Sequence, residues 1–184
     1  MRRRKSMKND IKDILFSEEM IRQRVKELGE ELTEAYAGKS LIIIGVLKGC
    51  FMFLADIVRH MDVECEIRFL TASSYGFSSV SSGKVNIDRE IDFDVKGKDI
   101  LILEDILDSG ITLTALRAFV AKHKPASLKI CTFLDKPERR QLPITADYTG
   151  FECPNEFVVG YGLDYAERYR NLPYVASLKP EVYS

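Results

Sequence analysis

Apolar residues follow two different patterns along the chain, one helical and one typical of buried strands. Between Ser17 and Gly38 they recur every three or four positions, which predicts one amphipathic helix with a serine N-cap and a glycine at its end. Residues 41–46 are continuously apolar instead, as expected of a strand buried on both faces. A buried strand directly after an amphipathic helix indicates a layered α/β domain.

The same two patterns continue through the rest of the chain. Helical spacing follows the break at Lys48 and extends to about residue 60, and it returns over residues 112–123. Four more strands are predicted, at residues 64–71, 100–103, 128–134 and 157–159. Residues 73–83 are rich in Ser and Gly, which predicts a long mobile loop after the second strand. Alternation of strands and helices predicts an α/β fold with a mainly parallel central sheet flanked by helices.

Composition and charge narrow the class of protein. The 184 residues fit a single domain at 11–184 after a flexible N-terminal extension at 1–10. The formal net charge of −1 offers no basic field for nucleic acid. No apolar run is long enough to span a bilayer, and the basic start is followed by polar residues rather than an apolar signal segment. The four cysteines form no C-x-x-C pair and are expected to be reduced, so we expect a cytoplasmic protein with no membrane partner.

Ligands of parallel sheets bind beyond the carboxyl ends of the strands, and residues 103–113 follow one such end. Glu104 and Asp105 place two adjacent carboxylates there. Ser109, Gly110 and Thr112 then supply hydroxyls and an open backbone where the next helix begins, a natural cradle for phosphate. An ordinary strand-to-helix loop with a polar cap is the alternative, but three acids after an apolar strand make it a minority interpretation.

Acids beside a phosphate cradle make physical sense only if they have a different ligand. The two carboxylates can face neutral ribose hydroxyls while the phosphate lies on backbone N–H groups, and a nearby Mg²⁺ ion would offset more of the negative charge. The loop therefore predicts binding of a sugar phosphate together with a metal.

This loop resembles the phosphoribosyl-pyrophosphate loop of the type I phosphoribosyltransferases. The family pattern is Glu-Asp, two apolar residues, Asp, and Thr-Gly-x-Thr; here Ser109 replaces the first Thr, and Ile111 stands at a variable position that is often basic. More narrowly, residues 11–175 resemble the bacterial hypoxanthine (guanine) phosphoribosyltransferases. The resemblance implies a small hood built from the chain ends, Mg²⁺-dependent transfer of phosphoribose to N9 of hypoxanthine or guanine, and a homo-oligomer, either dimer or tetramer.

The resemblance also implies roles within the loop. Asp108 is the implied general base, placed near the five-membered ring of the purine. The implied contacts to ribose and 5′-phosphate come from Glu104, Asp105, Asp108, Ser109, Gly110, Ile111 and Thr112. The implied metal ligands are Glu104, Asp105 and Asp164.

Two more loops are given roles by the resemblance. Lys48-Gly49 follows the first buried strand, where a surface turn and an anion site fit the residues equally well. The family uses this pair to bind pyrophosphate, often with a cis peptide before the Lys, and Arg170 resembles its pyrophosphate-binding arginine. Ser74 and Tyr75 read as a surface loop by themselves, whereas the family uses them as a lid that excludes water.

The purine subsite rests on four residues that would otherwise look unremarkable. Lys136 resembles the lysine that donates to the exocyclic oxygen; an ammonium has donors only, so it favours a 6-oxopurine over adenine. Phe157 would stack on the base, the Val158 carbonyl would accept from the 2-amino group of guanine, and Asp164 would lie beside the base.

Two alternatives remain at this stage. Some proteins with this loop are nucleotide-sensing regulators that bind RNA, against which the balanced charge argues. An enzyme of the same fold could use a pyrimidine or another acceptor, against which Lys136 and residues 157–164 argue.

Overall fold

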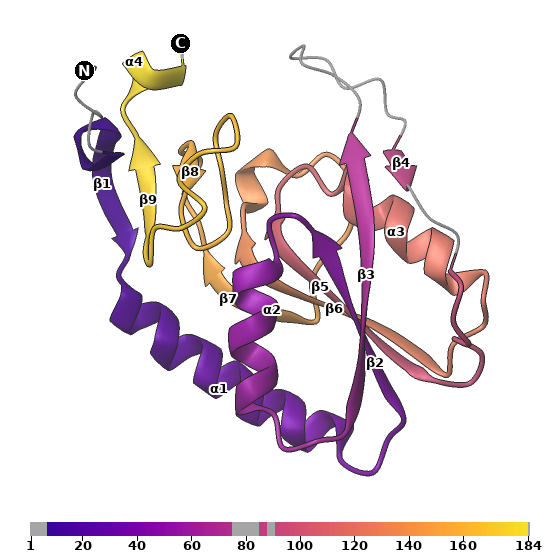
Figure 1. The fold of residues 1–184 in the computed structure, drawn as a ribbon. Coiled ribbons are helices and arrows are strands. Elements are labelled where there is room, and N and C mark those ends of the chain that lie inside the picture. The colour runs from indigo at the N-terminus through magenta and orange to yellow at the C-terminus, as the bar shows by residue number, and fades with distance from the viewer. Residues whose placement is uncertain (1–6, 75–84, 88–90, 184) are drawn as a thin grey trace.

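The computed structural model describes residues 7–74, 85–87 and 91–183, and its centre is a six-stranded sheet (Figure 1). The strands are β2 Leu41–Leu47, β3 Cys65–Ser74, β4 Val85–Ile87, β5 Asp99–Leu107, β6 Ser127–Asp135 and β7 Tyr148–Glu152. Their order is β4-β3-β2-β5-β6-β7, and every pair is parallel except β3 with β4. The predicted mainly parallel sheet is confirmed.

Helices cover both faces of this sheet. The helices of the described residues are η1 Met7–Asp10, α1 Glu18–Tyr36, α2 Phe51–Ile57, η2 Val58–His60, α3 Ile111–Ala121, η3 Pro137–Arg139 and α4 Pro180–Tyr183. Of these, η1 and α4 pack beside the strands at the two chain ends and not on this sheet. In Figure 1, α1 and α2 lie on one side of the sheet and α3 on the other. The Ser17 side chain accepts a 3.3 Å hydrogen bond from the Met20 backbone N–H, which confirms the predicted N-cap of α1.

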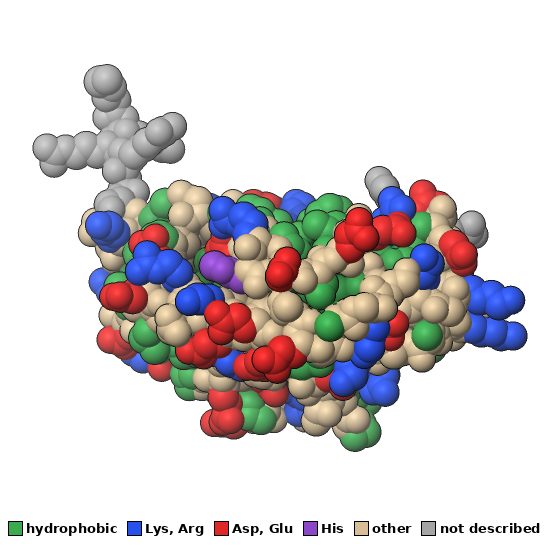
Figure 2. Space-filling view, turned by 90° about the horizontal axis from the view of Figure 1, so that it is seen from below, with side chains coloured by type: hydrophobic (Ala, Val, Ile, Leu, Met, Phe, Trp, Pro, Cys, Tyr) green, Lys and Arg blue, Asp and Glu red, His purple; other side chains and the backbone are tan. Residues whose placement is uncertain are grey.

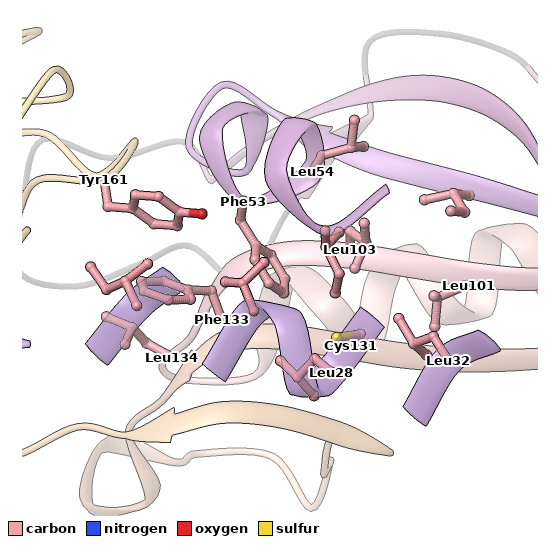
Figure 3. Close-up of a cluster of buried hydrophobic side chains, with 14 of the residues drawn as sticks. Leu28, Leu32, Phe53, Leu54, Leu101, Leu103, Cys131, Phe133, Leu134 and Tyr161 are labelled. Carbon is pink, nitrogen blue, oxygen red and sulfur yellow. The ribbon is translucent and has the colours of Figure 1, made fainter. Parts of the chain in front are cut away.

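The continuous apolar run of β2 is explained by helices on both faces. Ile43 packs in the cluster that includes α1 and α2, whereas Ile42 and Ile44 pack in the cluster that includes α3. Burial of each such side chain contributes about 1.5–3 kcal/mol relative to exposure. Figure 3 shows the first cluster, in which the rings of Phe53 and Phe133 lie with centroids 5.4 Å apart.

A second, antiparallel sheet forms the hood, in the order β1-β9-β8. Its strands are β1 Ile11–Phe16, β8 Val158–Val159 and β9 Val175–Leu178, so both ends of the chain contribute, as predicted. Figure 1 shows the hood at the end of the molecule toward which the arrowheads of β2 and β3 point. Tyr161 joins hood to core: its ring centroid lies 4.8 Å from that of Phe133, and its hydroxyl donates a 2.7 Å hydrogen bond to Asp56.

Of the predicted N-terminal extension at 1–10, residues 7–10 are described, and they form η1 against the hood. Asp10 is buried and accepts a 2.8 Å hydrogen bond from the Tyr169 hydroxyl. The Lys179 backbone N–H donates to the Asp10 carbonyl at 3.0 Å, which ties η1 to the end of β9.

Three sequence predictions about strands are corrected. The strand predicted to end at residue 103 continues to Leu107, because Glu104 and Leu107 stay paired with Thr132 and Asp135 of β6. Residues 157–159 belong to the hood rather than to the main sheet, whose fifth parallel strand, β7, was not predicted. β3 runs to Ser74, into the segment predicted as loop, because it pairs with β4.

The surface described by the structure mixes charges of both signs. On the face seen in Figure 2, basic and acidic side chains are interspersed. None of the helices in residues 7–74, 85–87 and 91–183 has the length and apolar character that a bilayer crossing requires.

Candidate active site

The turn that follows β2 directly contacts the last part of β5 at the carboxyl edge of the sheet. A Cβ atom on Gly49 would lie 1.6 Å from Asp105 Oδ2, and one on Gly162 would lie 2.1 Å from the Gly49 carbonyl oxygen. Both positions therefore require glycine. The Asp105 carboxylate, the 48–49 turn and the hood are stacked in that order at this edge.

The Lys48-Gly49 turn faces a charged cluster from the hood. The Leu47–Lys48 peptide is cis. Lys48 Nζ lies 3.0 Å from Glu167 Oε1, and Arg170 Nη2 lies 2.8 Å from Asp164 Oδ1. Nε of Arg170 is buried and has no hydrogen-bond partner among the described residues. The cluster thus combines two cations with an unused buried donor, which suits an anionic ligand.

The carboxylates of Glu104 and Asp105 are poorly solvated. Burial raises the pKa of Glu104 well above its ordinary value, and the neighbouring charge of Asp105 adds to this effect. Burial also raises the pKa of Asp105, against which the positive charge of Arg170 acts. Glu104 Oε2 is buried without a hydrogen-bond partner in the part of the chain that the structure describes.

This acid pair fits a hard divalent cation that is shared with a substrate. Within residues 7–74, 85–87 and 91–183, no three or more His, Cys, Asp or Glu side chains gather as a complete ligand set. Mg²⁺ characteristically binds through one or two carboxylates and takes its other ligands from water and substrate phosphates. An unpartnered carboxylate oxygen beside a second acid is that kind of site.

We call residues 103–113 the phosphate loop. Its turn into α3 is one that only glycine can adopt. Gly110 has φ +83° at the N-cap of α3, and a Cβ there would lie 2.6 Å from Ile144 Cγ2. Beyond Gly110, the first N–H groups of α3 have no partner within the helix, which makes them available to an anion. The Ser109 hydroxyl accepts a 3.4 Å hydrogen bond from the Ile111 N–H, so the substituted serine caps the same turn.

Residues 135–144 pack against this loop and hold it through hydrogen bonds. Arg140 Nε donates to the Asp108 carbonyl at 3.0 Å and Nη2 donates to the Leu107 carbonyl at 3.3 Å. The same guanidinium pairs with Asp135 and donates to the Ile144 carbonyl. Since these contacts join the end of β5 to the segment after β6, they fix the main chain on which the Asp108 carboxylate is carried.

The Asp108 side chain is partly exposed and only loosely partnered. Arg139 Nε forms an ion pair with Asp108 Oδ1 at 3.0 Å. Oδ1 is buried and has no hydrogen-bond partner within the described residues. A carboxylate oxygen in this state can accept a proton from a ligand.

Of the predicted purine residues, Lys136 lies close to the main chain before Phe157. Lys136 is 6% exposed, and Nζ donates to the Glu156 carbonyl at 2.5 Å. Burial lowers the pKa of Lys136. The ring of Phe157 is 39% exposed and stacks on Tyr183 with centroids 4.8 Å apart. Lys136 is thereby held next to the backbone that leads into Phe157.

The remaining predicted residues divide into three cases. Asp164 pairs with Arg170, so the structure places it with the pyrophosphate candidates. Val158 is buried in the hood. Of the predicted lid, Ser74 is the last residue of β3, described by its backbone only, and Tyr75 lies outside the described residues.

Comparison with known proteins decides which family has this arrangement. The phosphoribosyl transferase domain family matches residues 13–166. A hypoxanthine-guanine phosphoribosyltransferase of Bacillus subtilis (strain 168) is 55% identical over 177 residues, which cover 96% of this chain and 98% of that one. The chain belongs to the hypoxanthine-guanine phosphoribosyltransferase family.

Solved structures of phosphoribosyltransferases agree with this assignment. A hypoxanthine phosphoribosyltransferase from Staphylococcus aureus superposes with a TM-score of 0.93 at 48% identity, over 97% of each chain. By sequence alone, a hypoxanthine-guanine phosphoribosyltransferase of Streptococcus pneumoniae (strain ATCC BAA-255 / R6) is also similar, at 51% identity over 178 residues, 97% of this chain and 99% of that one. The resemblance that residues 103–113 suggested is confirmed, and so is the predicted fold.

Three residues near the site of this phosphoribosyltransferase escaped the sequence analysis. Arg139, Arg140 and Glu167 each contact a predicted site residue. The adjacent arginines that closely follow Lys136 were the only sequence signal for the first two. Nothing in the sequence marked Glu167, because its partner Lys48 lies 119 positions away.

Proposed function

We propose that this phosphoribosyltransferase moves the 5-phosphoribosyl group of phosphoribosyl pyrophosphate to N9 of hypoxanthine or guanine, forming IMP or GMP and releasing pyrophosphate. The observation that supports this best is Lys136. Its buried ammonium lies beside residues 156–157, and its backbone N–H donates to the Leu107 carbonyl at 2.9 Å, within the phosphate loop. The residue proposed to recognise the base is thus hydrogen-bonded to the segment proposed to bind the sugar phosphate.

The contact of Lys136 supports selection of a 6-oxo group. Nζ donates to a carbonyl oxygen, that of Glu156. An ammonium has three donors and no acceptor, so it can bind a second carbonyl oxygen on the purine while it keeps the first. The 6-amino group of adenine would bring a donor to the same place. A buried mismatch of two donors is strongly disfavoured.

Asp108 is proposed as the general base that takes a proton from the five-membered ring of the purine as N9 attacks ribose C1. The bond that breaks joins C1 to pyrophosphate, and the proton passes to the carboxylate. Oδ1 of Asp108 accepts no hydrogen bond from the described residues, which supports this assignment. Proton transfer by a positioned carboxylate typically contributes about 10²–10⁴-fold to the rate.

The sugar phosphate and the metal are assigned to the remaining residues of the loop. Ribose hydroxyls would meet Glu104 and Asp105, and the 5′-phosphate would meet residues 108–112 at the start of α3. Glu104 and Asp105, with Asp164 from the hood, would hold Mg²⁺. The chemistry that bound Mg²⁺ supplies is neutralisation of charge on the pyrophosphate leaving group.

Pyrophosphate itself is assigned to Lys48, Gly49 and Arg170, whose cations meet at the turn after β2. Phe157 and Val158 would hold the base, and Ser74 and Tyr75 would close over the reaction and exclude water. We also propose that the enzyme acts in the cytoplasm as a homo-oligomer. The RNA-binding alternative is not supported by the relatives, which are named as transferases.

The test is direct. The protein is incubated with phosphoribosyl pyrophosphate, Mg²⁺ and hypoxanthine, guanine, xanthine or adenine in turn, and nucleotide formation is followed chromatographically. We expect product with hypoxanthine or guanine, none with adenine, and loss of activity when Mg²⁺ is chelated. Absence of product with every 6-oxopurine would overturn the proposal.

A further inference from the structure

One carboxylate of the chain bridges both cations that are assigned to pyrophosphate. Glu167 Oε1 lies 3.0 Å from Lys48 Nζ, and Glu167 Oε2 lies 3.5 Å from Arg170 Nη2. Two oxygens of one anion thus face an ammonium and a guanidinium at once. Phosphate oxygens make the same kind of contacts with these groups.

The backbone around Glu167 holds it in this place. Ala166 and Glu167 both adopt the left-handed region, with φ of 50° and 59°. The Glu167 N–H donates a 2.9 Å hydrogen bond to Asp164, and Tyr165 and Arg168 exchange backbone hydrogen bonds of 3.2 and 3.1 Å across the turn. Such conformations persist in residues other than glycine only where the surroundings impose them. The turn therefore presents Glu167 to the cations as a built feature.

Glu167 is charged under ordinary conditions. Its pKa is lowered, chiefly by the hydrogen bond from Lys48, and the charges of Lys48 and Arg170 add to this. Pyrophosphate and Glu167 are both anions, so they cannot share the two cations without repulsion. Pyrophosphate must displace the side chain of Glu167 when it binds.

We infer that Glu167 is an internal counter-ion that competes with pyrophosphate for Lys48 and Arg170, weakening pyrophosphate binding and favouring its release. The inference rests on the pyrophosphate role proposed above for Lys48 and Arg170. Because Lys48 and Glu167 are each 65% exposed, water and salt screen the pair and the competition is modest.

The test measures the dissociation constant of Mg²⁺-pyrophosphate by titration calorimetry on the whole protein at fixed ionic strength. Glu167→Gln keeps the size of the side chain and removes its charge. We expect the constant to fall roughly two- to fivefold, the range of an exposed ion pair, and to fall further at low salt. The KM for hypoxanthine should not change, whereas inhibition by pyrophosphate should become stronger.

Glu30→Gln is the matched control. Glu30 pairs with Lys26 on α1 at 3.8 Å, and the two side chains are 63% and 57% exposed, so the variant removes the same charge from a similar pair elsewhere. It should leave pyrophosphate binding as in the wild type. An equal effect of both variants would mean that net charge alone acts, and would overturn the inference.

Lys48→Gln separates this inference from the proposed function. If Lys48→Gln leaves pyrophosphate binding unchanged, the assigned role of Lys48 is wrong and the inference is lost with it. If Lys48→Gln weakens binding but Glu167→Gln does not tighten it, only the counter-ion inference is overturned. We expect the effect of Glu167→Gln to shrink in the double variant, since one of the two cations that the carboxylate competes for is then absent.

Discussion

Arg140 Nε donates a 3.0 Å hydrogen bond to the main-chain carbonyl of Asp108, so a part-buried arginine supports the residue proposed as general base. The two residues are 32 positions apart and belong to segments that follow different strands. Arg140 does not need to touch a substrate to matter. By holding the backbone of the phosphate loop, it sets where the Asp108 carboxylate and the start of α3 lie.

Replacement of Arg140 by Met should damage both stability and substrate binding. The side chain is 15% exposed, and its loss removes the donor of the Asp135 carboxylate and of the Asp108 carbonyl, whereas the Leu107 carbonyl keeps the Lys136 N–H. Leaving part-buried acceptors without their donor in this way costs about 1–3 kcal/mol of the free energy of unfolding. We also expect a higher KM for phosphoribosyl pyrophosphate, measured by steady-state kinetics beside urea unfolding.

Arg139→Met serves as the comparison for that experiment. Arg139 is 52% exposed, so its loss should change the free energy of unfolding by no more than about 1 kcal/mol. Arg140→Lys keeps a charge near Asp135 but lacks the guanidinium fork, and should fall between wild type and Arg140→Met. Equal stability of the two Met variants would show that Arg140 does not hold the loop.

Asp108→Asn should lower kcat by about 10²–10⁴-fold, because the amide cannot accept the purine proton. KM for both substrates should change by much less, since the amide keeps the shape of the side chain. Pre-steady-state measurement of nucleotide formation isolates the chemical step. A variant that retains wild-type turnover would remove Asp108 from the role of base.

Lys136→Met should relax the choice between oxo- and aminopurines. A hydrogen bond from a charged donor contributes about 1.5–3 kcal/mol, so kcat/KM for hypoxanthine should fall by roughly 10- to 150-fold. The value for adenine should fall less or rise, since the competing donor is gone. If adenine is excluded as strongly as before, another group determines the choice of base.

Glu104→Gln should make the protein more stable and less responsive to metal. Burial raises the pKa of Glu104, which means that its ionised form costs stability at neutral pH, and a neutral amide removes that cost. Thermal unfolding should show a higher Tm for the variant, with about 2–4 °C for each kcal/mol gained. Mg²⁺ with phosphoribosyl pyrophosphate should raise the Tm of the wild type more than that of the variant. The opposite order would argue against Glu104 as a metal ligand.

Much of the fold was readable in the sequence because its signals are local. The Ser17 cap and the helical spacing behind it predicted α1, and the uninterrupted apolar run from residue 41 predicted a strand buried on both faces. Both signals arise within a few residues, from capping and from side-chain periodicity. The loop at residues 103–113 was found in the same way.

Pairing between distant segments decided where strands end and which sheet they join. Glu104 and Asp105 lie within β5 because β6 continues beside it, and Val158 joins the hood because β9 pairs with it. A local pattern of apolar residues does not encode the partner of a strand. For the same reason β7 was missed, although Tyr, Thr and Phe, which make up most of it, are common in strands.

The candidate site shows the same division between local sequence signals and contacts made by distant segments. The sequence by itself determined which residues are proposed to carry its chemistry: the acids of β5, the glycine turn into α3, and the lysines after β2 and β6. Only the tertiary structure decided what surrounds them, with Arg140 under Asp108 and Glu167 against Lys48. Such contacts depend on how whole elements pack, since charge and hydrogen bonding act through space and not along the chain.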